Sequence, residues 1–165
     1  MPLLWLIGLF CASSPAPPPA PPVAAEQAAP LSFPAGTPIA EVRAALAAHP
    51  EGVALKLAKG PRAWTGDEVE ALVHKSPEAR NLRALDLSGN PVGSAGAMAI
   101  AASPHLGALR SLDLSGCRIA EAGARGLAYS EGLAALETLR VDAKDPGPRG
   151  LEELKARFGA KLVLN

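Results

Sequence analysis

The sequence lacks an excess of charge of either sign. Its 16 Lys and Arg residues equal its 16 Asp and Glu residues, so the formal net charge is zero. The basic residues are scattered among acidic ones and form no cluster or stripe. A nucleic-acid-binding protein would carry a basic stripe, and a protein that binds anionic membranes a Lys/Arg cluster. Neither nucleic acid nor an anionic membrane surface is therefore an expected partner.

Aromatic residues and cysteines are also scarce. Aromatic residues make up 4% of the chain and apolar residues 48%, so we expect a core of Leu and Val with close Ala and Gly contacts. The two cysteines, Cys11 and Cys117, are too few for a disulfide framework. The three histidines, His49, His74 and His105, fall at unlike positions and do not converge. We therefore expect no metal ion, no cofactor and no catalytic site.

No apolar run at the N-terminus is long enough to span a bilayer. The run from Leu3 to Phe10 is far shorter than the roughly 20 residues that a spanning helix needs. Followed by small residues, it fits the hydrophobic core of a secretory signal over residues 1–14. Cys11 directly after the run resembles the lipid-attachment cysteine of bacterial lipoproteins, although Phe10 stands where that motif has Gly or Ala. This resemblance implies an exported protein, either periplasmic or anchored to the membrane through Cys11.

Two alternatives to lipidation stay open. Ordinary signal peptidase could cleave the chain after Ser13, or the N-terminus is not a signal at all and the protein is cytoplasmic. Residues 15–30 are rich in Pro and Ala. Because proline lacks the backbone N–H, such a tract forms neither helix nor sheet, and we expect a disordered, semi-rigid linker. The folded domain is then residues 31–165.

An internal repeat follows the linker. Residues 82–108 and 109–135 match at 14 of 27 positions without a gap. Both copies begin L-R-x-L-D-L-S-G and have Asn90 or Cys117 at the next position, before a Gly-Ala stretch. This pattern resembles the leucine-rich repeat, in particular its ribonuclease-inhibitor-like subtype, over about residues 53–164. The resemblance implies an α/β solenoid, with parallel strands on a concave face and helices on a convex face.

The spacing also predicts where the elements lie. Residues 53–57 read as a first strand, and strand leucines follow at Leu85, Leu112, Leu139 and Leu162, so we expect five strands. Helices are expected near 66–74, 94–102, 121–129 and 148–157, the first with a Thr65–Glu68 capping box and Trp64 packed over it. A further helix over 37–49, with Thr37 as its N-cap, should cap the solenoid.

Alternation along the strands predicts one row of charged residues on the concave face. With the leucines pointing inward, the central row reads Lys56, Asp86, Asp113, Arg140 and Val163. The adjacent aspartates would raise one another's pKa if they were unpaired, but a basic residue flanks each of them. The candidate partner-binding residues are Lys56, Asp86, Ser88, Asp113, Ser115, Arg140 and Asp142.

These features favour a protein–protein interaction module that binds an unidentified protein through its concave face, as is usual in the family that the repeat resembles. The alternative is a structural envelope protein or spacer without a specific ligand, and an enzyme has the least support. The last strand, around Leu162, ends the sheet without a covering helix. An uncovered strand of this kind can pair with another chain, so weak self-association through it is a further expectation.

Overall fold

The computed structural model describes residues 30–60 and 62–165. It contains a single six-stranded parallel sheet in which the strands follow chain order. The strands are β1 (Leu31–Phe33), β2 (Val53–Leu57), β3 (Leu82–Asp86), β4 (Ser111–Asp113), β5 (Thr138–Val141) and β6 (Leu162–Leu164). The predictions for residues 1–14, for Cys11 and for the linker up to residue 29 concern residues outside those described.

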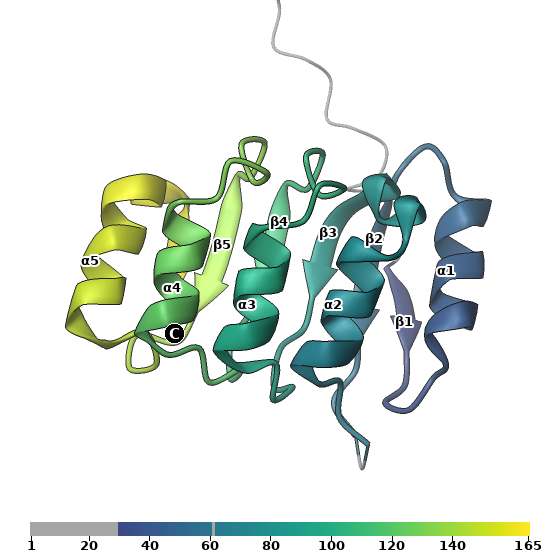
Figure 1. Ribbon diagram of the computed structural model, residues 1–165, viewed down its shortest axis with the longest axis horizontal. Coiled ribbons are helices and arrows are strands. Elements are labelled where there is room, and N and C mark those ends of the chain that lie inside the picture. Colours follow the sequence, from purple (N-terminus) through teal and green to yellow (C-terminus); the bar gives the residue numbers. More distant parts are fainter. Residues whose placement is uncertain (1–29, 61) are drawn as a thin grey trace, which may run out of the picture.

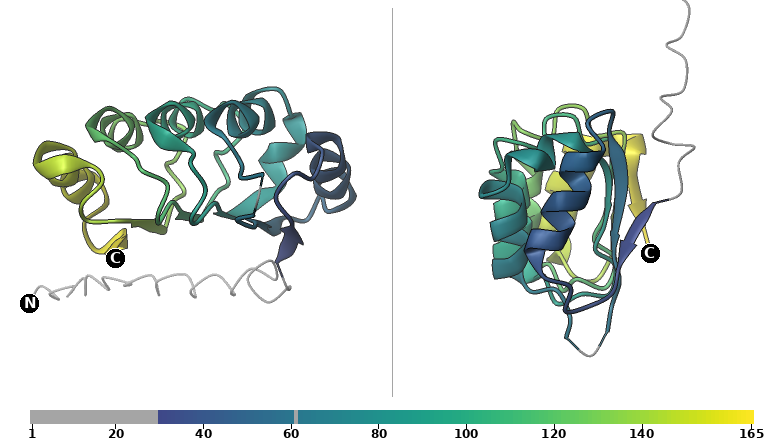
Figure 2. Two further views of the ribbon diagram at one scale, coloured as in Figure 1. Left: turned by 90° about the horizontal axis from the view of Figure 1, so that it is seen from below. Right: turned by 90° about the vertical axis from the view of Figure 1, so that its right-hand side faces the viewer.

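Five α-helices connect the strands. They are α1 (Ile39–Ala48), α2 (Gly66–His74), α3 (Gly93–Ala101), α4 (Glu121–Ala128) and α5 (Gly147–Phe158). All five lie on the same side of the sheet, in a row that bows outward, while the other side of the sheet carries no helix of the described chain (Figures 1 and 2). The predicted α/β solenoid, with strands on one face and helices on the other, is therefore confirmed.

A ladder of leucines forms the core between the two layers. The register aligns Leu55, Leu85, Leu112 and Leu139 on neighbouring strands. These side chains are at most 1% exposed. The 27-residue spacing therefore sets the pairing of the strands, because each leucine that enters the core brings its strand into the same register as the last.

The structure corrects the predicted start of the solenoid. There are six strands among the described residues and not five, because the predicted set did not include β1, which pairs in parallel with β2. Thr37 is not the N-cap of the first helix: Pro38 directly precedes the first helical residue, Ile39. The Thr37 hydroxyl instead donates to the Pro34 carbonyl at 2.8 Å. The helix α1 thus follows a strand of its own, as in the later repeats.

The start of α2 has the capping box that its sequence indicates. The Thr65 side chain accepts a bond from the Glu68 backbone, and the Glu68 carboxylate accepts one from the Thr65 backbone at 3.0 Å. Trp64, immediately before the cap, is 2% exposed. The two reciprocal bonds satisfy N–H groups that the first turn of a helix otherwise leaves free.

Glycines bring neighbouring helices together. We expected Gly96 and Gly123 to let the helices approach the strands, but their Cα atoms face the preceding helix or its N-terminus. A Cβ at Gly123 would lie 2.9 Å from Ser94 Cα, and one at Gly96 would lie 3.0 Å from Gly66 Cα. Gly150 stands in the same relation to Glu121, at 3.3 Å. Close helix–helix contact is therefore the reason for glycine at this repeated position.

Candidate protein-binding surface

Four charged side chains form one row across the helix-free face of the sheet. The register pairs Lys56 with Asp86, Asp86 with Asp113, and Asp113 with Arg140. Val163 on β6 continues the row beyond Arg140. The alternation along the strands therefore predicted the order of this row. We call its four charged members, Lys56, Asp86, Asp113 and Arg140, the charge row.

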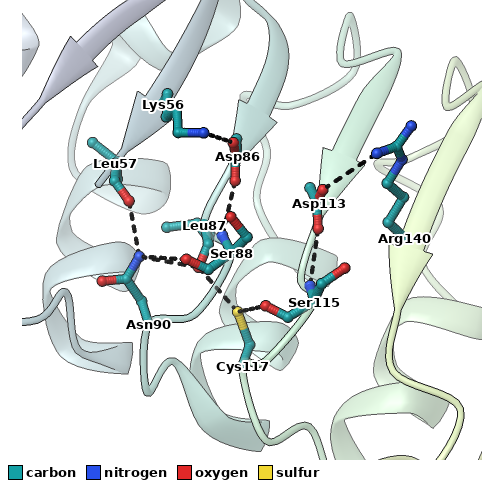
Figure 3. Close-up of polar contacts among 10 residues, drawn as sticks. All are labelled: Lys56, Leu57, Asp86, Leu87, Ser88, Asn90, Asp113, Ser115, Cys117 and Arg140. Atoms are coloured by element: carbon teal, nitrogen blue, oxygen red, sulfur yellow. Dashed lines mark hydrogen bonds and ion pairs between the residues drawn. The ribbon is translucent and has the colours of Figure 1, made fainter. Parts of the chain in front are cut away.

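Each aspartate of the charge row faces a basic residue (Figure 3). Lys56 Nζ lies 3.1 Å from Asp86 Oδ2, and Arg140 Nη1 lies 3.9 Å from Asp113 Oδ2. Burial alone would raise the pKa of Asp86, but hydrogen bonds from Ser88 and the Lys56 ammonium outweigh that effect. The pKa of Asp86 is consequently below its usual value, and this carboxylate is charged at neutral pH.

The same aspartates also hold the turns that follow their strands. The Ser88 backbone N–H donates to Asp86 Oδ1, and the Ser115 N–H donates to Asp113 Oδ1, each at 2.9 Å. These two bonds are local side-chain-to-backbone bonds of the kind that aspartate often makes at turns. One oxygen of each carboxylate therefore fixes the backbone, while the other faces the neighbouring base.

The remaining predicted residues lie one row further along, at the turns. Asp142 Oδ2 accepts a bond from the Gly116 N–H at 2.7 Å, so this carboxylate secures a neighbouring turn. The Ser115 hydroxyl accepts a bond from Asn165 Nδ2 at 2.7 Å. Ser88 and Ser115 are both half-buried. This second row is thus tied into the scaffold more fully than the charge row is.

A hollow of about 260 Å³ lies beside the charge row on the same face. Its floor includes the small side chains Ala54, Ala84 and Ser111, which the register places next to one another on β2, β3 and β4. Pro30 also lines it. We had assigned Pro30 to the linker, and the strand that directly follows it, β1, was the missing signal. Small residues beside long charged ones give this face a step in height that another molecule can enter.

Below the charge row, Asn90 and Cys117 satisfy backbone groups inside the turns (Figure 3). Asn90 Nδ2 donates to the Leu57 carbonyl at 2.8 Å, and Asn90 Oδ1 accepts from the Trp64 N–H at 3.0 Å. Cys117 Sγ donates to the Leu87 carbonyl at 3.1 Å. Burial raises the pKa of the Cys117 thiol to about 12, so it stays protonated at neutral pH. A protonated, buried thiol is a structural group and a poor nucleophile.

The convex face has a hollow of its own. It lies at the C-terminal ends of α3 and α4, and the exposed side chains of Met98 and Tyr129 line it. Tyr129 is 71% exposed. This hollow provides a natural reference point on the opposite side of the molecule.

The histidines remain apart, as their sequence positions indicate. His49 Nδ1 lies 3.0 Å from Glu51 Oε1, and His74 Nε2 lies 2.8 Å from the Ala99 carbonyl oxygen. Within residues 30–60 and 62–165, no three His, Cys, Asp or Glu side chains come together in a way that could hold a metal ion. None of the helices in this part of the chain combines the length and the apolar character that crossing a bilayer requires.

Comparison with known proteins agrees with the repeat architecture. A family model described as Leucine Rich repeat matches residues 78–101 and 109–128. These two segments contain β3 with α3, and β4 with α4. No curated protein matches the chain. Leucine-rich repeats generally mediate protein–protein interaction and are typically not enzymes. The two matched repeats, set in a six-stranded parallel solenoid, support the assignment of this chain as a leucine-rich repeat protein.

Proposed function

We propose that this chain is a protein-interaction module that binds another protein through its concave face. The observation that carries the proposal is the charge row beside the 260 Å³ hollow, on the side of the sheet that no helix of the described chain covers. The Lys56 and Arg140 side chains are about half exposed, at 49% and 54%. Charges of this kind remain available to a partner while their neighbours fix them in place.

Affinity capture of the full chain from its native cells tests the proposal. The variant for the test is Asp86→Asn combined with Asp113→Asn and Arg140→Gln. Asparagine keeps an Oδ1 acceptor for the Ser88 and Ser115 N–H groups, so the turns retain their bonds. We expect the triple variant to lose the captured protein, with its circular dichroism spectrum unchanged.

Two further variants make the capture experiment decisive. Tyr129→Ala alters the convex hollow and should leave capture unchanged. Shortening residues 15–30 tests the alternative of a spacer, because a spacer depends on that length and tolerates changes in the charge row. Capture that survives the triple variant but is lost with Tyr129→Ala would contradict binding through the concave face.

We also propose the ribonuclease-inhibitor-like subtype for the repeats. Its support is the 27-residue spacing between corresponding leucines and the regular alternation of strand and α-helix from β2 to α5. Insertion of one further 27-residue copy after residue 108 should then give a folded chain with one more strand and helix. A small increase in helical circular dichroism per chain would be the readout, and an unfolded product would count against the subtype.

For the N-terminus, we propose export with lipid attachment at Cys11. The support is the apolar run before Cys11 and the Pro-rich tract that follows it. Labelling of cells with a fatty-acid analogue should mark the wild-type chain and not Cys11→Ser. Separately, weak self-association through β6 rests on Val163 and Leu164, each 37% exposed at the edge of the sheet. A monomer at every concentration in light scattering would exclude it.

A further inference from the structure

The charges of the charge row have a definite order. From β2 to β5 the order is positive, negative, negative, positive, with the two carboxylates next to one another in the middle. Neighbouring strands lie about 4.8 Å apart, so the whole row spans about 14 Å. The carboxylates are the less exposed members, at 30% for Asp86 and 22% for Asp113, and the bases at the two ends are the more exposed.

The compensation within the row is unequal. Lys56 approaches Asp86 to 3.1 Å, whereas Arg140 comes no nearer to Asp113 than 3.9 Å. A charged carboxylate has two oxygens with about four acceptor positions. The Ser115 N–H and the distant Arg140 leave Asp113 with unused acceptor capacity. The centre of the row can therefore accept further donors that carry positive charge.

We propose that the concave face, acting as the protein-binding surface proposed above, takes a helical segment of its partner that presents two neighbouring basic residues to Asp86 and Asp113. Acidic residues one turn before and one turn after them meet Lys56 and Arg140. The aliphatic stems of the basic side chains lie over the low floor formed by Ala54, Ala84 and Ser111. Electrostatic complementarity of this kind sets specificity and register more than raw affinity.

The spacing of the row favours a helix over an extended segment. Residues on one face of an α-helix recur about once per turn, at about 5.4 Å, which is close to the 4.8 Å between strands. An extended segment presents every second residue on one face, at about 6.7 Å. Over three intervals the helix differs from the row by about 2 Å, which long side chains can absorb, whereas the extended segment differs by about 6 Å.

A second copy of this chain does not fit the same face. The charge order reads the same in both directions. A two-fold axis along the row places each residue opposite itself, and one across its centre places Lys56 opposite Arg140 and Asp86 opposite Asp113. Both arrangements oppose like charges, which is costly at an interface. Nor can residues 1–29 supply two basic groups, since Glu26 is their only charged residue.

Two stapled helical peptides of identical composition provide the test. Both carry four charged residues at positions i, i+4, i+7 and i+11 of an otherwise Ala- and Gln-based helix, in the order Glu-Lys-Lys-Glu in one and Lys-Glu-Glu-Lys in the other. Calorimetric titration of the full chain at low salt should give about ten-fold tighter binding of the first peptide. The preference should shrink at high salt, because exposed ion pairs are screened.

Variants of the chain locate the effect on the charge row. Asp86→Asn with Asp113→Asn should abolish the preference between the peptides, and Arg110→Gln with Glu137→Gln should leave it unchanged. Arg110 and Glu137 form an exposed ion pair outside the row, at 2.7 Å, and so match the change in charge. Equal affinity for the two peptides, preference for the second, or no binding of either would overturn the inference.

The peptide test and the capture test fail independently. If capture from cells depends on the charge row but the peptides are not distinguished, the concave face binds a partner of different chemistry, and this inference is wrong while the proposed function stands. If capture is insensitive to the row, the proposed function itself is wrong.

Discussion

Replacing Asn90 by Ala should remove the most consequential polar side chain of the solenoid. Asn90 is fully buried and donates to the Leu57 carbonyl, while its own carbonyl accepts from the Trp64 N–H. The substitution leaves both of these backbone groups without their partner in the interior. Each such group costs about 1–3 kcal/mol, so the free energy of unfolding should fall by about 2–6 kcal/mol. That is a large part of the stability of an ordinary domain.

The repeat supplies a matched comparison. Cys117 occupies the same position one repeat later, but its thiol donates to the Leu87 carbonyl, which also accepts from the Asn90 backbone N–H at 3.1 Å and from Asn90 Nδ2 at 3.0 Å. Cys117→Ala therefore leaves no carbonyl unpaired there and should cost only about 1 kcal/mol, a typical net value for one hydrogen bond.

Urea denaturation followed by circular dichroism would compare the two variants, with linear extrapolation to water. The argument requires the loss for Asn90→Ala to exceed the loss for Cys117→Ala by at least about 1 kcal/mol. Equal losses would refute it, because they would mean that the number of backbone groups left unpaired does not control the cost.

Two other predictions concern packing and pH. Gly123→Ala should destabilise the chain by about 1–3 kcal/mol in the same denaturation assay, because the new Cβ would lie 2.9 Å from Ser94 Cα, whereas Gly107→Ala, with no heavy atom within 4 Å of the new Cβ, should be close to neutral. Similar losses for both glycines would contradict the close-contact explanation. Because the pKa of Asp86 is lowered in the folded state, its stabilising contribution is present above the unfolded pKa of about 4 and is lost as the pH falls through the folded value. The difference in stability between the wild type and Asp86→Asn, measured by denaturation from pH 7 to pH 2, should therefore shrink towards low pH, and a difference that is constant with pH would be inconsistent with the ion pair to Lys56.

The central part of the fold was predictable because its information is local and repeated. The leucines at 27-residue intervals specify which strands pair and in which register, and the alternation along each strand then orders Lys56, Asp86, Asp113 and Arg140. The first strand, β1, was not predictable in this way. It has three residues, lacks the repeated leucine pattern, and owes its conformation to pairing with β2.

The turn contacts of the candidate surface were equally hard to foresee. The bonds from Asp142 to Gly116 and from Asn165 to Ser115 depend on the path of irregular loops, for which alternation and periodicity contain no information. By contrast, a row of buried serines did carry a signal. Ser103 and Ser130 lie 27 residues apart, and each hydroxyl donates to a carbonyl at the end of the preceding helix, those of Val73 and Ala101.

The parallel sheet with one repeat per strand also means that the binding face is modular along the chain. A duplication of 27 residues adds one column to the face, and a deletion removes one, without changing the height of the groove or the local environment of the other columns. Ligand specificity in such a protein can change by altering the number and order of columns, as in a word whose letters are added or removed. The four charged columns described above would then be one short word among many that the same scaffold can spell.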